Sequence, residues 1–229
     1  PETRAATRNL LEALESDYPD DARSLFAIAL LEWREGNGAV AVTKLDKLFT
    51  IDAFHDRGTL LLTEILLQAN DAGAFDPLRK AIEATNSGLL RYEYARYLLG
   101  KKKLAEAKEQ FDVLVAGPTV IVDHLIGAAV LDIELSDSAS ALLHLDRALA
   151  SGQRVSDAQF FKALALIQLE DLSGALKALA EVGPSTNYAR ALKEAAAILV
   201  SRGVVNTLDE GTVPIGLKSS FTIKISKNS

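Results

Sequence analysis

The sequence predicts an all-α fold: a right-handed superhelical stack of antiparallel helix pairs (an α-solenoid) with a short non-helical C-terminal tail. A small residue recurs four positions before an apolar one, at Ala6, Ala41, Ala107, Ala141 and Ala175. The intervals between these alanines are 35, 66, 34 and 34 residues, and 66 is close to twice 33, so one weaker unit lies in the second gap. Because one such unit cannot bury its apolar face alone, stacked neighbours supply a continuous core.

The composition agrees with a folded helical-repeat chain and excludes several classes of function. Apolar residues make up 48% of the 229 residues and charged residues 24%, which is too apolar for disorder. The net charge of -6 argues against a nucleic-acid partner, which needs a basic face. No run reaches the ~20 apolar residues of a membrane span. The absence of cysteine excludes disulfides and thiolate sites and leaves the compartment open.

Residues 1–20 predict half of a repeat. Ala6, Leu10 and Ala13 lie at the spacing of a second helix, and Pro19 ends the pattern. No first helix precedes them, so we expect the packing face of this helix to be bare. This favours a sequence that starts part-way through a repeat.

Residues 21–184 predict about five helix pairs, each with a first helix, a tight turn, a second helix and a helix-breaking link. The second pair is degenerate: Asp76-Pro77 marks the start of its second helix, and Leu78 takes the place of the small residue. The apolar positions of the other four pairs are Leu25, Ile28, Ala29, Ala41, Leu45 and Leu48; Tyr94, Ala95, Leu98, Ala107, Phe111 and Leu114; Leu125, Ala128, Ala129, Ala141, Leu145 and Ala148; and Ala163, Leu166, Ala175, Leu179 and Val182.

The C-terminal part of the chain predicts a cap and then a tail. Residues 185–203 contain one more helical pattern, ended by Gly203, that would cover the open end of the stack. Residues 204–229 change period, since Phe221, Ile223 and Ile225 alternate with polar residues as in a strand. Three interpretations of this tail stay open: a disordered terminus, the start of a β domain, or an extended peptide that docks on a surface.

The recurring small residues resemble the tetratricopeptide repeat (TPR) pattern. Small residues stand at Ala29, Ala95, Ala129 and Ala163 in the first helices, and the second-helix alanines follow at a spacing near 34 residues. The resemblance covers about residues 6–202 and is strongest over 94–184. Glu32 and Asp132 depart from it, because an aromatic residue or leucine is usual there. A related array of helix pairs with looser rules is the alternative.

The resemblance implies that a concave face, lined by the first helices, binds a peptide or another protein. The helical spacing of the first helices also predicts that Thr63 faces this concave side. A packing role between repeats is the alternative for Phe26 and Phe160. The face lacks the Lys and Asn residues of TPR proteins that clamp a terminal carboxylate, which favours an apolar or amphipathic ligand segment. The candidate partner-binding residues are Phe26, Leu30, Trp33, Arg34, Asn70, Tyr92, Arg96, Ile126, Val130 and Phe160.

No catalytic, cofactor-binding or metal-binding site can be assembled from the sequence. Gly36-Asn37-Gly38 resembles a dinucleotide fingerprint but follows a predicted helix instead of a strand. His55, His124 and His144 lack the spacing of metal ligands, and we expect His144 to be a packed or surface residue. We also expect no carboxylate in an apolar setting that could serve as a tuned acid or base. The chain is therefore not expected to be an enzyme.

The sequence favours a non-enzymatic scaffold that binds a protein or peptide. The alternative is a structural or spacer module of a larger envelope or secretion assembly, in line with the half repeat at one end and the strand-like tail at the other. Self-association is a further possibility, because the apolar residues of the tail suit a neighbour's groove. The identity of the partner and the cellular location are left open.

Overall fold

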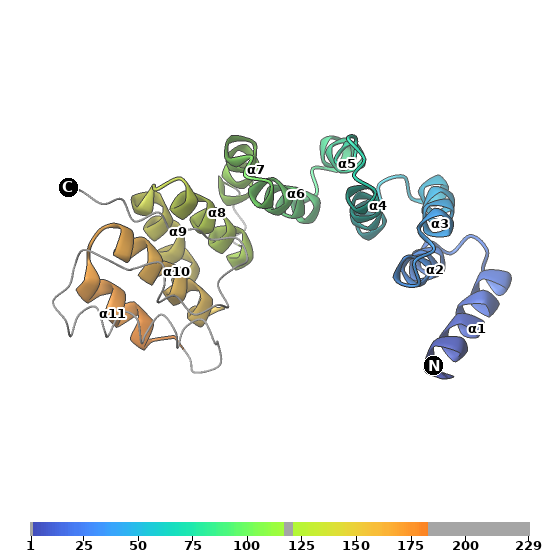
Figure 1. Ribbon diagram of the computed structural model, residues 1–229, viewed down its shortest axis with the longest axis horizontal. Coiled ribbons are helices and arrows are strands. Elements are labelled where there is room, and N and C mark those ends of the chain that lie inside the picture. Colours follow the sequence, from blue (N-terminus) through green and yellow to red (C-terminus); the bar gives the residue numbers. More distant parts are fainter. Residues whose placement is uncertain (1, 117–120, 183–229) are drawn as a thin grey trace. The chain divides into compact units, whose positions relative to one another are not determined.

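The computed structural model describes residues 2–116 and 121–182, and within these ranges it contains eleven α-helices and no strand (Figure 1). This confirms the predicted all-α helical-repeat fold. The predicted capping helix and tail, residues 185–203 and 204–229, lie outside the described residues. The helices are α1 (Glu2–Asp17), α2 (Ala22–Arg34), α3 (Gly38–Ile51), α4 (Asp56–Gln68), α5 (Asp76–Thr85), α6 (Gly88–Gly100), α7 (Leu104–Ala116), α8 (Val122–Glu134), α9 (Ser138–Ala150), α10 (Val155–Gln168) and α11 (Leu172–Ala180).

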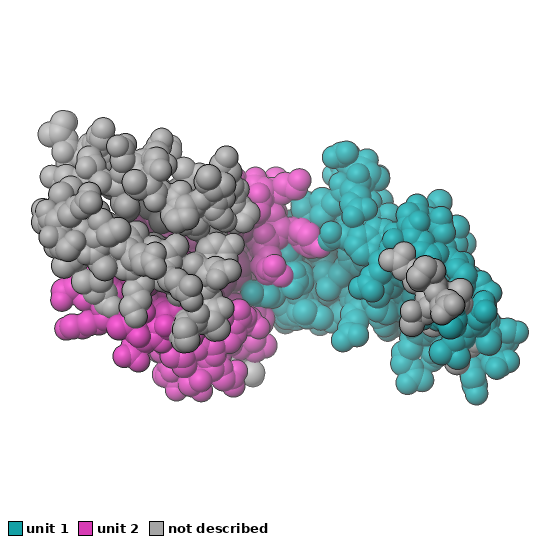
Figure 2. Space-filling view, turned by 60° about the horizontal axis from the view of Figure 1, so that its bottom comes forward, with its two compact units in different colours: residues 1–94 teal, residues 95–229 magenta. Residues whose placement is uncertain are grey.

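The chain divides into two compact units, residues 1–94 and 95–229 (Figure 2). The division falls within α6. In unit 1, α2 packs on α3 and α4 on α5, and a cluster around Ala29, Leu45 and Leu61 joins the two pairs. In unit 2, α8 packs on α9 and α10 on α11, around clusters that contain Ala129 and Ala163. Each unit is therefore built from helical hairpins that pack on one another.

The predicted small residues lie in the core. Ala29, Ala95, Ala129 and Ala163 are fully buried in the first helices. The second-helix residues Ala41, Ala107, Ala141 and Ala175 are buried too. Because the distance between two helix axes follows the size of the side chains at the contact, alanine allows the pairs to pack tightly.

The degenerate second pair uses threonine for the same purpose. Thr63, 34 residues after Ala29, is fully buried, and its hydroxyl donates to the Thr59 carbonyl at 2.9 Å. Because Thr63 is fully buried, it does not line an exposed face, which corrects the prediction from the sequence. Leu78 is fully buried in α5, at the position expected for the small residue.

Helix α1 exposes its apolar stripe. Ala6, Leu10 and Ala13 are all exposed, and Leu10 keeps 61% of its surface accessible. The contacts of α1 with the rest of unit 1 include charged side chains instead: Arg8 pairs with residues at the end of α2, and Glu15 pairs with Lys44 of α3. These ion pairs lie on a different side of α1 from Ala6, Leu10 and Ala13.

One residue in the left-handed conformation closes each hairpin. These residues follow the first helices at near-constant intervals: Gly36, Asn70, Lys102, Ser136 and Glu170, with φ between 55° and 87°. A positive φ costs a residue with a Cβ atom roughly 1–2 kcal/mol, and glycine and asparagine tolerate it best. Three of the five turns therefore carry a residue that is poorly suited to its backbone conformation.

We predict that Ser136→Gly and Glu170→Gly each raise the free energy of unfolding by about 0.5–1 kcal/mol, because glycine adopts the left-handed conformation without a steric cost. Urea denaturation followed by circular dichroism measures the change. Gly36→Ala is the matched control: a Cβ there meets no atom within 4 Å, so a loss of about 1 kcal/mol isolates the backbone effect. Equal stability of all three variants and the wild type would contradict the prediction.

Candidate partner-binding surface

Two first helices of unit 1, α2 and α4, lie side by side and run in the same direction. At their N-terminal ends, the Phe26 ring lies 5.6 Å from the ring of His55, which caps α4 by accepting from the Gly58 N–H. At their C-terminal ends, the Trp33 indole N–H donates to the Gln68 side-chain oxygen at 3.2 Å. The two contacts fix matching ends of the two helices against each other.

One partly exposed side of α2 is an apolar stripe with basic ends. Phe26, Leu30 and Trp33 follow one another at helical spacing, so they lie on one face. All three are partly buried against the unit 1 core and keep part of their surface accessible. Arg23 precedes this stripe and Arg34 follows Trp33, and both arginines are exposed. We call these five residues the α2 stripe.

The other candidate residues of unit 1 lie outside the α2 stripe. Asn70 is exposed and occupies the left-handed turn after α4, a conformation that asparagine tolerates well. Tyr92 is partly buried on α6. The left-handed turn thus explains the choice of asparagine at position 70 without a role in binding.

The candidate residues of unit 2 are mostly part of its core. Ile126 and Val130 are buried on α8, a helix that buries ten of its thirteen residues. Phe160 on α10 is partly buried and packs edge-to-face on Phe161, with ring centroids 5.2 Å apart. Arg96 is exposed. In unit 2 the predicted positions therefore offer little apolar surface, whereas the α2 stripe of unit 1 offers more.

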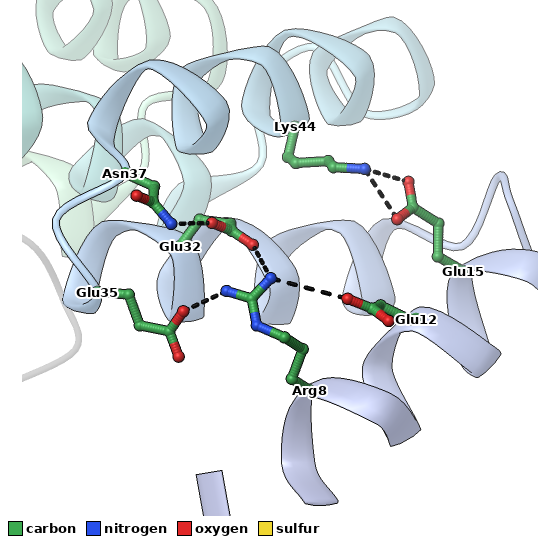
Figure 3. Close-up of polar contacts among 7 residues, drawn as sticks. All are labelled: Arg8, Glu12, Glu15, Glu32, Glu35, Asn37 and Lys44. Carbon is green, nitrogen blue, oxygen red and sulfur yellow. Dashed lines mark hydrogen bonds and ion pairs between the residues drawn. The ribbon is translucent and has the colours of Figure 1, made fainter. Parts of the chain in front are cut away.

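A buried carboxylate that sequence reasoning treated only as a departure from a pattern organises the start of unit 1 (Figure 3). Glu32 is 7% exposed; its side chain accepts a hydrogen bond from the Asn37 amide at 2.7 Å and pairs with Arg8 at 2.9 Å. The hydrogen bond from Asn37, the largest cause, and the charge of Arg8 lower the pKa of Glu32. Arg8 also pairs with Glu12 and Glu35. This group of side chains links α1, α2 and the start of α3.

A second buried carboxylate lies 100 residues later, in unit 2. Asp132, 2% exposed, is 2.9 Å from Nδ1 of His144. The sequence predicts no carboxylate in an apolar setting that could serve as a tuned acid or base; Asp132 is nonetheless buried between α8 and α9, where His144 is its partner. His144 is packed, as expected, and no group of three or more potential metal ligands occurs among the described residues.

The signal for both polar groups was present in the sequence. The first helices of the other three pairs carry Leu66, Leu98 and Leu166 at the matching position, so Glu32 and Asp132 replace a core leucine. A buried charge needs a partner, and Asn37 and His144 stand on the next helix or turn. These polar groups are complete within their own units and do not point to a reaction.

Burial of His124 predicts a stability that falls on mild acidification. Desolvation, the largest cause, lowers the pKa of His124 below its ordinary value, while the charge of Asp123 opposes the shift. The unfolded chain therefore binds a proton more readily than the folded chain, so this contribution is complete above about pH 6.5 and is lost as pH falls through the folded pKa. The lowered pKa values of Asp21, Glu32 and Asp137 act in the same direction at lower pH.

Urea denaturation between about pH 7.5 and about pH 5.5 measures this effect. His124→Gln should flatten the dependence in this range whatever its effect on stability at neutral pH. An unchanged slope in His124→Gln would contradict the prediction.

Comparison with solved structures shows which fold these helix pairs form. Yeast Tom70 matches with a TM-score of 0.69 at 18% identity, over 84% of this chain and 43% of Tom70. YrrB, a TPR protein with an unusual peptide-binding site, matches with a TM-score of 0.58 at 16% identity, over 80% of this chain and 97% of YrrB. The chain has a TPR fold. PilW, a widely conserved type IV pilus biogenesis factor, matches with a TM-score of 0.56 at 18% identity, over 70% of this chain and 75% of PilW.

The similarity to these TPR proteins is one of structure. No family model and no curated protein matches the sequence, and this chain spans less than half of Tom70. At 16–18% identity, the three comparisons show the fold and leave the partner open. In the parts of the TPR chain that the structure describes, no helix has the length and apolar character needed to cross a membrane.

Proposed function

We propose that this chain is a non-enzymatic scaffold that binds an apolar or amphipathic segment of a protein or peptide through the α2 stripe and the adjoining face of α4. The observation that carries the proposal is that Phe26, Leu30 and Trp33 of the α2 stripe are partly exposed on a helix held against α4. Large apolar side chains in a row favour contact with another molecule when they are not fully covered.

Rigidity of the α2 stripe supports this proposal. The Trp33 indole is held by Gln68, and Phe26 is held against His55, so little side-chain freedom would be lost when a partner binds. TPR folds are typically non-catalytic. YrrB, which this chain resembles in structure, is described as having a peptide-binding site. A binding role for this chain agrees with that description.

The test is cross-linking mass spectrometry and affinity capture from the source cells with the full chain. Trp33→Ala and Tyr92→Ala should reduce capture of partners, Trp33→Ala more strongly because Trp33 lies in the α2 stripe. Leu143→Ala is the matched control, because Leu143 is an exposed apolar residue on a second helix of unit 2. Partners that persist unchanged with Trp33→Ala would overturn the choice of this surface.

A further inference from the structure

At three positions of the first helices, the side-chain charge has opposite signs in the two units. Arg23, Arg34 and Arg57 in unit 1 stand 100 residues before Asp123, Glu134 and Asp157 in unit 2. The offset of 100 residues corresponds to three helix pairs, since it also relates Ala29 to Ala129 and Ala41 to Ala141. The same places on the fold thus carry cations in one unit and carboxylates in the other.

In unit 2 the structure shows how these charges are satisfied. The Arg154 guanidinium pairs with Asp123 of α8 and, at 2.9 Å, with Asp157 of α10, so one cation bridges two neighbouring first helices. Glu134 at the end of α8 pairs with Lys102 at 2.7 Å. Each of the three carboxylates therefore has a cationic partner from within the unit.

In unit 1 the corresponding arginines lack such partners. Arg34 and Arg57 are exposed and form no ion pair with any described residue, and the Arg23 side chain is 91% exposed with one contact of 3.3 Å to Asp21. Position 54, which corresponds to Arg154, holds Phe54 instead of an anion. No carboxylate of unit 1 takes the bridging place that Arg154 takes in unit 2.

These arginines frame the apolar surface already described. Arg23 is one turn before Phe26 on α2, and Arg57 is two residues after His55, whose ring contacts Phe26. Arg34 follows Trp33 at the other end of the α2 stripe. The surface therefore combines apolar side chains in the middle with exposed guanidinium groups at both ends.

We propose that the partner of this surface is an amphipathic peptide segment with acidic residues, and that one of its carboxylates bridges Arg23 and Arg57 as Arg154 bridges Asp123 and Asp157 in unit 2. A second carboxylate pairs with Arg34 next to Trp33. This inference rests on the proposed function, because it names the chemistry of the segment that the α2 stripe binds. Carboxylates pair with guanidinium groups through charge-assisted, often bidentate hydrogen bonds, which suits this arrangement.

The first experiment selects peptides from a random library of about 12 residues, displayed on phage, against the full chain and against its Trp33→Ala variant. We expect peptides that depend on Trp33 and that are enriched in Asp and Glu beside Leu, Phe or Trp. Peptides that depend on Trp33 but show no acidic enrichment would overturn this inference and leave the proposed function intact. Peptides that bind Trp33→Ala equally well, or no recovered peptide, would overturn the proposed function.

The second experiment measures the affinity of one selected peptide by fluorescence anisotropy. Arg57→Gln and Arg34→Gln should each weaken binding about tenfold at low salt, and less at high salt. A Glu→Gln change in the peptide should remove most of the effect of Arg57→Gln, as expected for two groups in contact. Lys80→Gln is the control, because Lys80 is an exposed cation of α5 outside this surface. Equal losses from Lys80→Gln and Arg57→Gln would overturn the specific role of the arginine.

Discussion

Replacing His144 by leucine should lower the local stability of α8 and α9 by about 3 kcal/mol. Asp132 is almost fully buried and His144 lies 2.9 Å from its carboxylate, so His144→Leu leaves a charge in the core without its partner. Leaving a buried polar group without its hydrogen-bond partner typically costs about 1–3 kcal/mol, and more when the group is charged, because the group stays desolvated. Native-state hydrogen exchange of the α8 and α9 amides measures the loss.

The informative control is Asp132→Leu. This change restores the residue type of Leu66, Leu98 and Leu166 at the matching position of the other pairs. Exchanging a buried ionic group for an apolar residue of similar size is often neutral or stabilising, so we expect a change within about 1 kcal/mol. If both variants lost equal stability, the loss would reflect packing at this site and the buried-charge explanation would fail.

Replacing Ala141 by leucine should lower the stability of unit 2 by about 2–3 kcal/mol. Ala141 is fully buried in the cluster that joins α8, α9 and α10, where the helix axes come close. A larger side chain forces the axes apart or takes an unfavourable rotamer, and overpacking of this kind typically costs about 1–3 kcal/mol.

The matched control is Ala139→Leu, which makes the same change two residues earlier at an exposed position of α9. It should alter stability by less than about 0.5 kcal/mol. Urea denaturation followed by circular dichroism compares the two variants. A similar loss in both would show that leucine destabilises α9 itself, in conflict with a role for Ala141 in helix spacing.

Much of the fold could be predicted from the sequence, because its signal is repeated. The small residues at Ala41, Ala107, Ala141 and Ala175 fix where the second helices pack, and each of the four supports the others. The degenerate pair was harder, since Thr63 is a polar residue type, and only the structure shows that its hydroxyl is satisfied by Thr59.

The candidate surface was less predictable than the fold. A periodic pattern assigns Phe26 and Ile126 to the same place on a first helix, yet Phe26 keeps accessible surface and Ile126 is buried. The difference in accessible surface depends on which helices pack around each first helix, and the sequence of one helix does not contain that information. The pairing of Asp132 with His144 was missed for a similar reason: the two residues stand on different helices, and their contact depends on how those helices pack.

The acidic groups inside the cores of two pairs have a consequence for how the chain assembles. Repeated hairpins of similar sequence can stack in the wrong order, because the apolar face of one resembles the face of another. Glu32 is sensitive to such an error, because its cation Arg8 comes from the preceding helix α1, whereas Asp132 keeps His144 within its own hairpin. A chain in which another hairpin stacks on α2 would therefore bury the Glu32 carboxylate without its cation.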